Sequence, residues 1–347
     1  MKRLIRQSVV SLSSYTPGEQ PAESGIIKLN TNENPYPPSP RVQEALREMN
    51  ADRLRLYPDP VSVELRARIA EMHGCEASRV FAGNGSDEIL ALCSRAFVED
   101  DGSIGYFVPS YSLYPVLADI RCVAKKPVPL GEAFDWRMPA DDLSSLFFLA
   151  NPNAPTGILY PKESVAEFCR RFRGVVLMDE AYVDFASANC VDLALTLPNV
   201  LVMRTLSKSY SLAGLRVGYA VGEGRLIEAL FKLKDSYNLD AISQRLALAA
   251  LRDPRHMQSN AARIKATRGR LTEALRGLGF QVCPSETNFL WVKPPVRAAR
   301  EVFQRLKDER IFVRYFPGER TGDYLRITVG TDPEVDRLLE AVGRMGE

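Results

Sequence analysis

Short apolar runs alternate with amphipathic stretches along the middle of the chain. The runs are rich in Val, Ile, Leu and Phe, and they lack the in-and-out alternation of a strand with one solvated face. Their sequences are RVFAG, SIGYFVP, SLFFLANP, GVVLMDE, NVLVMRTLS and RVGYAVG. Stretches with helical periodicity, such as DEILALCSRAFVE and PKESVAEFCRRF, lie between them. This alternation predicts an α/β fold in which helices cover both faces of a mostly parallel sheet.

The pattern changes toward the C-terminus. A long helical pattern over residues 256–278 precedes the short strand-like runs GFQVC, TNFLWVK, IFVRYF and YLRITVG, which indicate a smaller α+β domain. Near the N-terminus, TPGEQPAESG and NENPYPPSP are rich in turn formers and predict an extended arm. We therefore expect an arm over residues 1–45 that joins the small domain, a large domain over residues 46–250 and a small domain over residues 251–347.

Composition excludes several classes of function. The 347 residues carry 45 Lys and Arg against 43 Asp and Glu, so no global field favours nucleic acid or an anionic membrane. The six cysteines form no CxxC pair and the two histidines have no ligand-spaced neighbour, which argues against a zinc site and a Ser-His-Asp triad. The start lacks an apolar signal region, and no run approaches ~18 apolar residues. We expect a cytoplasmic protein with reduced core thiols and no metal.

Polar residues follow five of the predicted strands, where ligands bind in open α/β sheets. GNGSDE is a glycine-rich turn that feeds a helix N-terminus, and Gly85 and Ser86 there suit an anion such as a phosphate. A plain capped turn is the alternative for this motif. Ser207 and Arg216 add a hydroxyl and a fork of donors that suit phosphate oxygens, although an arginine can simply lie on the surface.

The remaining strand ends carry residues that suit a planar, charged cofactor. Asp179 closes an apolar run and needs a cationic partner such as a protonated ring nitrogen, unless it caps a loop in the core. Tyr182 could reach a phenolate oxygen, and Tyr111 could stack on a ring or merely pack. Lys208, beside the predicted phosphate site, would then be the nucleophile that forms a Schiff base. Together these residues predict pyridoxal 5′-phosphate as the cofactor.

The chain resembles the fold-type I pyridoxal-phosphate aminotransferases of the aspartate aminotransferase superfamily through MDEAY and TLSK…GLR. Within it, KLNTNENPYPPSP, VRYF and LRITVGT are similar to the histidinol-phosphate aminotransferases, and the resemblance covers nearly the whole length. It implies a ping-pong exchange in histidine biosynthesis, in which L-histidinol phosphate and 2-oxoglutarate give imidazole acetol phosphate and L-glutamate.

Other functions on the same scaffold stay open. Threonine-phosphate decarboxylases resemble this family closely and also bind an amino phosphate. An aromatic amino-acid aminotransferase is the other alternative, because Tyr15, Tyr36 and Tyr111 could line an apolar slot. A non-catalytic cofactor-binding protein is disfavoured by the presence of Lys208, and a dehydrogenase by the lack of a GxGxxG turn with a downstream acid.

The resemblance also implies a role for each site residue. Lys208 would form the Schiff base and transfer the proton, Asp179 would pair with the ring nitrogen, and Tyr182 would bond the ring oxygen O3′. The cofactor-binding residues would be Gly85, Ser86, Asp87, Ser207 and Arg216 at the phosphate, Tyr111 stacked on the ring, and Tyr57 reaching across the interface of an obligate homodimer.

The substrate-binding residues implied in the same way are Tyr15, Asn34, Arg314 and Arg326. Arg326 would clamp an α-carboxylate, and Arg314 with Tyr15 would meet the substrate phosphate. Both arginines interrupt apolar runs, which suits a cleft, although edge-strand arginines would look the same.

One position departs from the superfamily pattern. The residue before PTG is usually an asparagine that donates to O3′, and here it is Ala154. Asn153 could rotate into its place, water could substitute, or Tyr182 could bond O3′ alone. Asn153 is therefore retained among the expected cofactor-binding residues.

Overall fold

A seven-stranded sheet forms the centre of this computed structural model, which describes residues 4–13, 15–21, 24–139 and 144–345. The order of strands across the sheet is β2 (Val80–Asn84), β8 (Val217–Gly222), β7 (Val200–Thr205), β6 (Val175–Asp179), β5 (Leu146–Ala150), β3 (Ser103–Val108) and β4 (Ala124–Pro129). Of these seven strands, β8 alone runs in the opposite direction to the others, so it pairs antiparallel with both β2 and β7. The predicted α/β fold with a mostly parallel sheet is confirmed.

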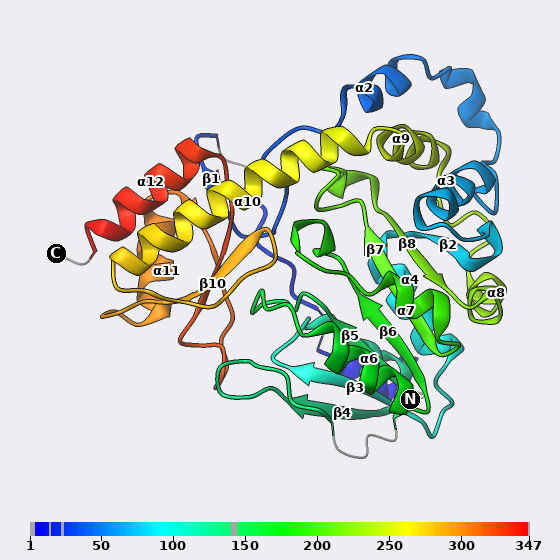
Figure 1. Ribbon diagram of the computed structural model, residues 1–347, viewed down its shortest axis with the longest axis horizontal. Helices are drawn as coiled ribbons and strands as arrows, with labels where there is room; N and C mark the ends of the chain where they lie inside the picture. The colour runs from blue at the N-terminus through cyan, green and yellow to red at the C-terminus, as the bar shows by residue number, and fades with distance from the viewer. Residues whose placement is uncertain (1–3, 14, 22–23, 140–143, 346–347) are drawn as a thin grey trace.

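Helices cover both faces of this sheet (Figure 1). Successive residues of β5 show why its sequence is apolar throughout, because Phe148 packs with α4 and α5 while Phe147 packs on the other face with α6 and α7. The helices around the sheet are α3 (Val63–His73), α4 (Gly85–Ala96), α5 (Leu113–Arg121), α6 (Lys162–Arg171), α7 (Val191–Thr196), α8 (Gly224–Leu233) and α9 (Ala241–Leu251).

A second, antiparallel sheet follows in the C-terminal part. Its order is β12 (Arg314–Tyr315), β13 (Leu325–Thr328), β10 (Phe289–Lys293) and β9 (Gln281–Val282). The accompanying helices are α10 (Pro254–Gly277), α11 (Ala299–Asp308) and α12 (Asp332–Gly343). Figure 1 shows α10 running from the vicinity of α9 to α11 and α12.

The N-terminal segment is tied to this C-terminal part. Its short strand β1 (Ile27–Lys28) pairs in parallel with β11 (Ile311–Phe312). The segment therefore lies between the two sheets, where it can contribute to a site. The domain boundaries near residues 45 and 250 stay predictions.

Some elements were not predicted. The strand β4 reads AKKPVP and lies at the edge of the sheet, where lysine and proline are tolerated and the apolar signal is lost. The remaining elements are the helices α1 (Gln7–Val10) and α2 (Pro40–Arg47) and the 3₁₀ turns η1 (Ala51–Arg55), η2 (Ala77–Arg79), η3 (Val183–Phe185) and η4 (Ala213–Leu215).

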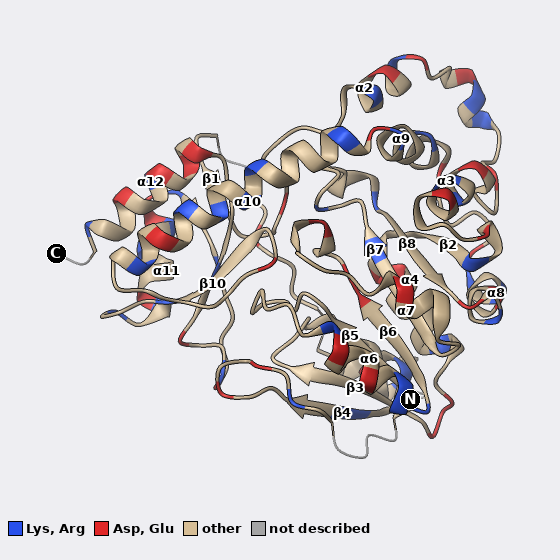
Figure 2. Cartoon of the chain, in the orientation of Figure 1, with Lys and Arg blue, Asp and Glu red and all other residues tan. Residues whose placement is uncertain are grey.

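Charge and thiols are distributed without a dominant cluster. On the outer helices α10 is mainly basic, α12 is mainly acidic and α11 carries both signs (Figure 2). All six cysteines are free. Among the described residues no helix could cross a membrane, and no group of His, Cys, Asp and Glu could hold a metal ion.

Candidate active site

A cavity of about 240 Å³ opens beyond the carboxyl ends of the central strands. The opposite wall is built by the N-terminal segment and by residues of the second sheet. From the loops after the strands its lining includes Ser86, Asp87, Tyr111, Ala154, Asp179, Tyr182, Ser207, Lys208 and Arg216, and from the opposite wall Tyr15, Gly18, Gln20, Thr31, Asn32, Arg314 and Arg326. Most of the residues predicted for one site therefore line one cavity.

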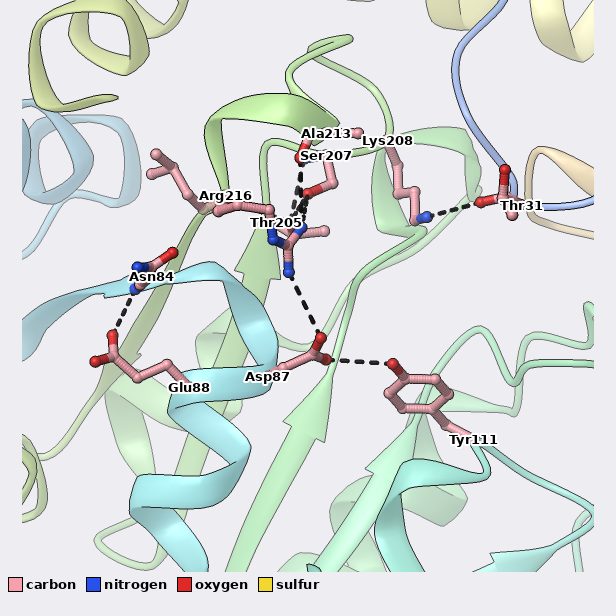
Figure 3. Close-up of polar contacts among 11 residues, drawn as sticks. Thr31, Asn84, Asp87, Glu88, Tyr111, Thr205, Ser207, Lys208, Ala213 and Arg216 are labelled. Atoms are coloured by element: carbon pink, nitrogen blue, oxygen red, sulfur yellow. Dashed lines mark hydrogen bonds and ion pairs between the residues drawn. The ribbon is translucent and has the colours of Figure 1, made fainter. Parts of the chain in front are cut away.

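One end of the cavity is a cradle of hydrogen-bond donors. The backbone turns into α4 at Gly85 with φ +77°, which favours glycine, and a Cβ there would lie 2.6 Å from Nη2 of Arg216, so a side chain would also displace this guanidinium. The first N–H groups of α4, at Ser86 and Asp87, have no partner within the helix. Arg216 donates from Nη1 to Oγ of Ser207 at 3.3 Å, and its Nη2 lies 3.5 Å from Oδ2 of Asp87 (Figure 3). This donor set suits a phosphate group.

Asp179 ends β6 and is buried against the floor of the cavity. Its Oδ2 accepts from the hydroxyl of Tyr114 at 2.8 Å, and its Oδ1 accepts from the N–H of Ala181 at 3.1 Å. Burial nevertheless raises the pKa of this carboxyl to about 6. Within the described part of the chain no lysine or arginine forms an ion pair with it. A buried carboxylate without a cationic partner is suited to pair with a protonated ring nitrogen of a ligand.

Lys208 extends from the loop after β7 into the cavity. Its Nζ donates to the backbone carbonyl of Thr31 at 3.2 Å, across from the strand ends (Figure 3). Burial and the nearby guanidinium of Arg326 lower the pKa of this amine to about 8, with a further contribution from Arg216. An amine with this pKa can act both as a nucleophile and as a base near neutral pH.

Tyr182 lies beside Lys208. Its ring packs edge to face on Phe289, with 5.0 Å between centroids, and Nζ of Lys208 is 5.8 Å from the ring centre. The Nδ2 group of Asn32 donates to its hydroxyl oxygen at 2.8 Å. Burial raises the pKa of Tyr182, so it is a neutral phenol with one proton to donate.

Two arginines face the strand ends from the second sheet. Arg326 stands between the rings of Phe289 and Phe316, donates to the carbonyl of Asn30 at 2.9 Å, and keeps a buried Nε without a partner among the described residues. Arg314 donates to the carbonyls of Thr16 and Pro17 at 2.8 and 3.0 Å. Their remaining N–H groups suit anionic parts of a substrate.

Two tyrosines, Tyr15 and Tyr111, form an aromatic side of the cavity. Tyr111 donates to Oδ1 of Asp87 at 3.2 Å, and Tyr15 packs edge to face on Tyr111 at 5.8 Å between centroids. Tyr111 is therefore placed between the cradle and the N-terminal segment.

Four predicted residues do not line the cavity: Gly85, which shapes the turn behind the cradle, and Asn153, Asn34 and Tyr57. Asn153 is 1% exposed, and its amide donates to the carbonyl of Pro109 and to Thr156 and accepts from Ser110. Rotation of Asn153 into the site would break these bonds, so that alternative does not agree with the structure.

The other two are Asn34 and Tyr57. Asn34 donates to the carbonyls of Lys208 and Ser209 at 3.2 and 3.0 Å, which holds the lysine loop from behind. Tyr57 is 81% exposed and stacks on Tyr237 on the outer surface, with 4.4 Å between centroids. Neither residue reaches the cavity of its own chain.

Sequence reasoning missed Tyr114 and Asn32. Tyr114 belongs to SYSLYP, in which only Tyr111 was selected, and Asn32 belongs to TNENP. Each bonds a predicted site residue from a distant point in the chain, and the sequence carries no signal for such a contact.

The donor set fits pyridoxal 5′-phosphate, since it offers a lysine amine, a buried carboxylate and a phosphate cradle in one cavity. Comparison with known proteins agrees. The family model for aminotransferase class I and II matches residues 24–342. The chain is 46% identical over 342 residues to "Histidinol-phosphate aminotransferase 2" of Thiobacillus denitrificans, covering 96% of this chain and 95% of the relative. It is 44% identical over 338 residues to "Histidinol-phosphate aminotransferase" of Microcystis aeruginosa, covering 97% of each.

Solved structures share the fold. The histidinol-phosphate aminotransferase of Sinorhizobium meliloti, in complex with pyridoxal-5′-phosphate, superposes with a TM-score of 0.86 at 26% identity and covers 92% of this chain and 90% of that one. The L-threonine-O-3-phosphate decarboxylase of Porphyromonas gingivalis gives a TM-score of 0.83 at 20% identity, over 92% of this chain and 99% of that one, which is a likeness of fold alone.

Proposed function

Because the chain belongs to the class I and II aminotransferases, we infer that it is a pyridoxal-phosphate-dependent enzyme that transfers the amino group of L-histidinol phosphate to 2-oxoglutarate. The products are imidazole acetol phosphate and L-glutamate. The observation that carries this assignment is the single cavity in which Lys208, Asp179 and the phosphate cradle face Arg314 and Arg326.

When bound, pyridoxal phosphate supplies an aldehyde for the amine and a protonated ring that withdraws electrons from the bond to be broken. Lys208 would hold it covalently and Asp179 would keep its ring nitrogen protonated. Tyr182 would donate its hydroxyl proton to the ring oxygen, and Tyr111 would stack on the ring. The phosphate would be held by the N–H groups of Gly85, Ser86 and Asp87 together with the side chains of Ser207 and Arg216.

Lys208 is also the base that moves the proton. Its pKa of about 8 leaves about one tenth of the amine neutral at pH 7 and half at pH 8. With the cofactor bound, the neutral amine would take a proton from Cα of the substrate and return it to the carbon on the other side of the substrate nitrogen, which had carried the aldehyde oxygen. The carbonyl of Thr31 can accept from Nζ when the lysine is free, and Asn34 holds the backbone of its loop.

The arginines divide the work of substrate binding. L-histidinol phosphate has no α-carboxylate, whereas glutamate has one, so Arg326 serves the dicarboxylic partner. Arg314, with Tyr15, binds either the phosphate of L-histidinol phosphate or the distal carboxylate of glutamate. Since both substrates use the same cavity in turn, this sharing suits a ping-pong exchange.

We further propose that two copies of the chain form a homodimer in which Tyr57 reaches the phosphate cradle of the partner subunit. The proposal is supported by apolar side chains that surround Tyr57 on the surface. Leu54 and Leu56 are 53% and 50% exposed and line a groove together with Ile242. Exposed apolar patches of this kind mark protein–protein contacts.

A half-reaction tests the proposed function. The enzyme loaded with pyridoxal phosphate is mixed with one amino compound and no keto acid, and absorbance follows conversion to the pyridoxamine form. We expect rapid conversion by L-histidinol phosphate and L-glutamate and far slower conversion by L-phenylalanine. A preference for phenylalanine would make the protein an aromatic aminotransferase, and release of carbon dioxide from L-threonine phosphate would make it a decarboxylase.

A further inference from the structure

Residue 154 offers no side-chain hydrogen-bond donor to a cofactor in the cavity. Ala154 lines the cavity but has no donor. The neighbouring Asn153 cannot replace it, because its amide is fully engaged with Pro109, Thr156 and Ser110. The ring oxygen of the cofactor therefore depends on the polar groups around Tyr182.

Asn32 is the polar group that touches Tyr182. It is 1% exposed, lines the same cavity, and stands in the left-handed region at φ +57°. Three contacts fix it. Its N–H donates to Oγ1 of Thr328 at 3.0 Å, its Oδ1 accepts from the same hydroxyl at 3.1 Å, and its carbonyl accepts from Asn288 at 3.0 Å.

These contacts determine which way the amide points. With its oxygen on the Thr328 hydroxyl, Asn32 presents its NH₂ group to Tyr182, at 2.8 Å from the phenolic oxygen. A phenol has one proton to donate, and Asn32 cannot accept it through an NH₂ group. The proton of Tyr182 is then free to point into the cavity, and the donated bond makes the phenol a stronger donor.

We propose that Asn32 is a positioning residue for Tyr182, which it orients and polarises as a donor to the ring oxygen, so that the chain compensates for the missing side-chain donor at position 154. The inference rests on the proposed function, because it concerns the residue that bonds the cofactor. It involves a contact between two parts of the chain separated by 150 residues.

The test is a pH titration of the absorbance of bound pyridoxal phosphate in Asn32→Ala. A hydrogen-bond donor stabilises the negative charge on the ring oxygen of the cofactor. This lowers the pKa of the nitrogen that would join Lys208 to the cofactor, because the charged oxygen then attracts the proton of that nitrogen less strongly. Loss of the Asn32 amide should therefore raise the pKa of the absorbance transition by about one unit and weaken cofactor binding about tenfold. The charged groups that act on Tyr182 are Lys208, Arg326, Asp179 and Asp87, and all remain in this variant.

Asn30→Ala is the matched control. Asn30 lies two residues earlier, is 2% exposed, and its amide donates to the carbonyl of Glu19 rather than to a cavity residue. We expect it to titrate like the wild type. A shift of equal size in both variants would overturn the proposal in favour of a general loosening of the segment.

A double-mutant cycle then asks whether Asn32 acts through Tyr182. In a Tyr182→Phe background, Asn32→Ala should add no further shift. Additive shifts, or an unshifted transition in a folded Asn32→Ala protein, would overturn the inference alone. A wild-type protein that binds no pyridoxal phosphate would instead overturn the proposed function and the inference with it.

Discussion

The hydroxyl of Tyr114 donates to Oδ2 of Asp179 at 2.8 Å, from the first turn of helix α5 to the end of the central strand β6. This bond partly offsets the burial that raises the pKa of Asp179, since it stabilises the charged form. Tyr114 itself is completely buried, so the bond lies in a dry region where its strength is high.

Tyr114→Phe should raise the pKa of Asp179 further above 6 without changing the shape of the site. The carboxyl would then be partly protonated near pH 7 and could not stabilise a cationic ring nitrogen. We expect the Kd of pyridoxal phosphate to rise about fivefold to twentyfold at pH 7, and less at pH 8.5. Titration of apoprotein at both pH values measures the effect, and equal losses at the two pH values would contradict it.

Asp179→Asn should stabilise the apoprotein while it removes activity. The folded pKa of about 6 lies above the unfolded value of 3.8, so the unfolded chain ionises first and stability falls as pH rises from about 4 to 6. The neutral amide avoids this loss and should add about 2 kcal/mol to the free energy of unfolding at pH 7.

Urea unfolding of the wild type and Asp179→Asn at pH 4 and pH 7 makes the comparison. The difference should be large at pH 7 and much smaller at pH 4, where the carboxyl is protonated in the folded protein and only about half ionised in the unfolded chain. Turnover at pH 7 should fall by about a hundredfold or more, because the ring nitrogen loses its charged partner.

Lys208→Ala should abolish multiple turnover and leave the fold intact. The side chain forms one hydrogen bond, to the carbonyl of Thr31, so its removal disturbs little packing. Lys126→Ala, on the exposed edge strand β4, is the control and should keep full activity. Substantial turnover by the Lys208 variant would refute the assignment of this residue.

The attachment of pyridoxal phosphate to apoprotein should accelerate with pH. Only the neutral amine reacts, and with a pKa of about 8 its fraction rises nearly tenfold per unit below pH 8 and levels off above it. Stopped-flow absorbance between pH 6 and pH 10 gives the profile. A rate that keeps climbing to pH 10 would mean that the amine has an ordinary lysine pKa.

Arg326→Ala and Arg314→Ala should separate the two substrates. Loss of Arg326 should raise the KM for glutamate about a hundredfold and change that for L-histidinol phosphate much less, because only glutamate has an α-carboxylate. Loss of Arg314 should raise both. Half-reaction kinetics with each donor measures the split, and equal effects of Arg326→Ala on both donors would contradict the division of roles.

The strand ends of the central sheet could be predicted from sequence because they follow a general rule. Apolar runs between helical patterns place Asp179, Ser207 and Lys208 at the same edge of the sheet, whatever the loops do. The same rule does not predict the contacts of Tyr114 and Asn32. Their hydrogen-bond partners lie 65 and 150 residues away, and the contacts depend on how helix α5 and the N-terminal segment pack. Asn153 shows the converse error, since a residue adjacent to the expected position proves to be committed to its own loop.

The hydrogen bond between Asn32 and Thr328 joins positions 296 residues apart. A chain emerging from the ribosome can form the central sheet well before residue 328 is synthesised, but it cannot complete the wall that orients Tyr182. On the proposal for Asn32, a chain that ends before Thr328 lacks this contact and should hold pyridoxal phosphate less tightly than a full-length copy.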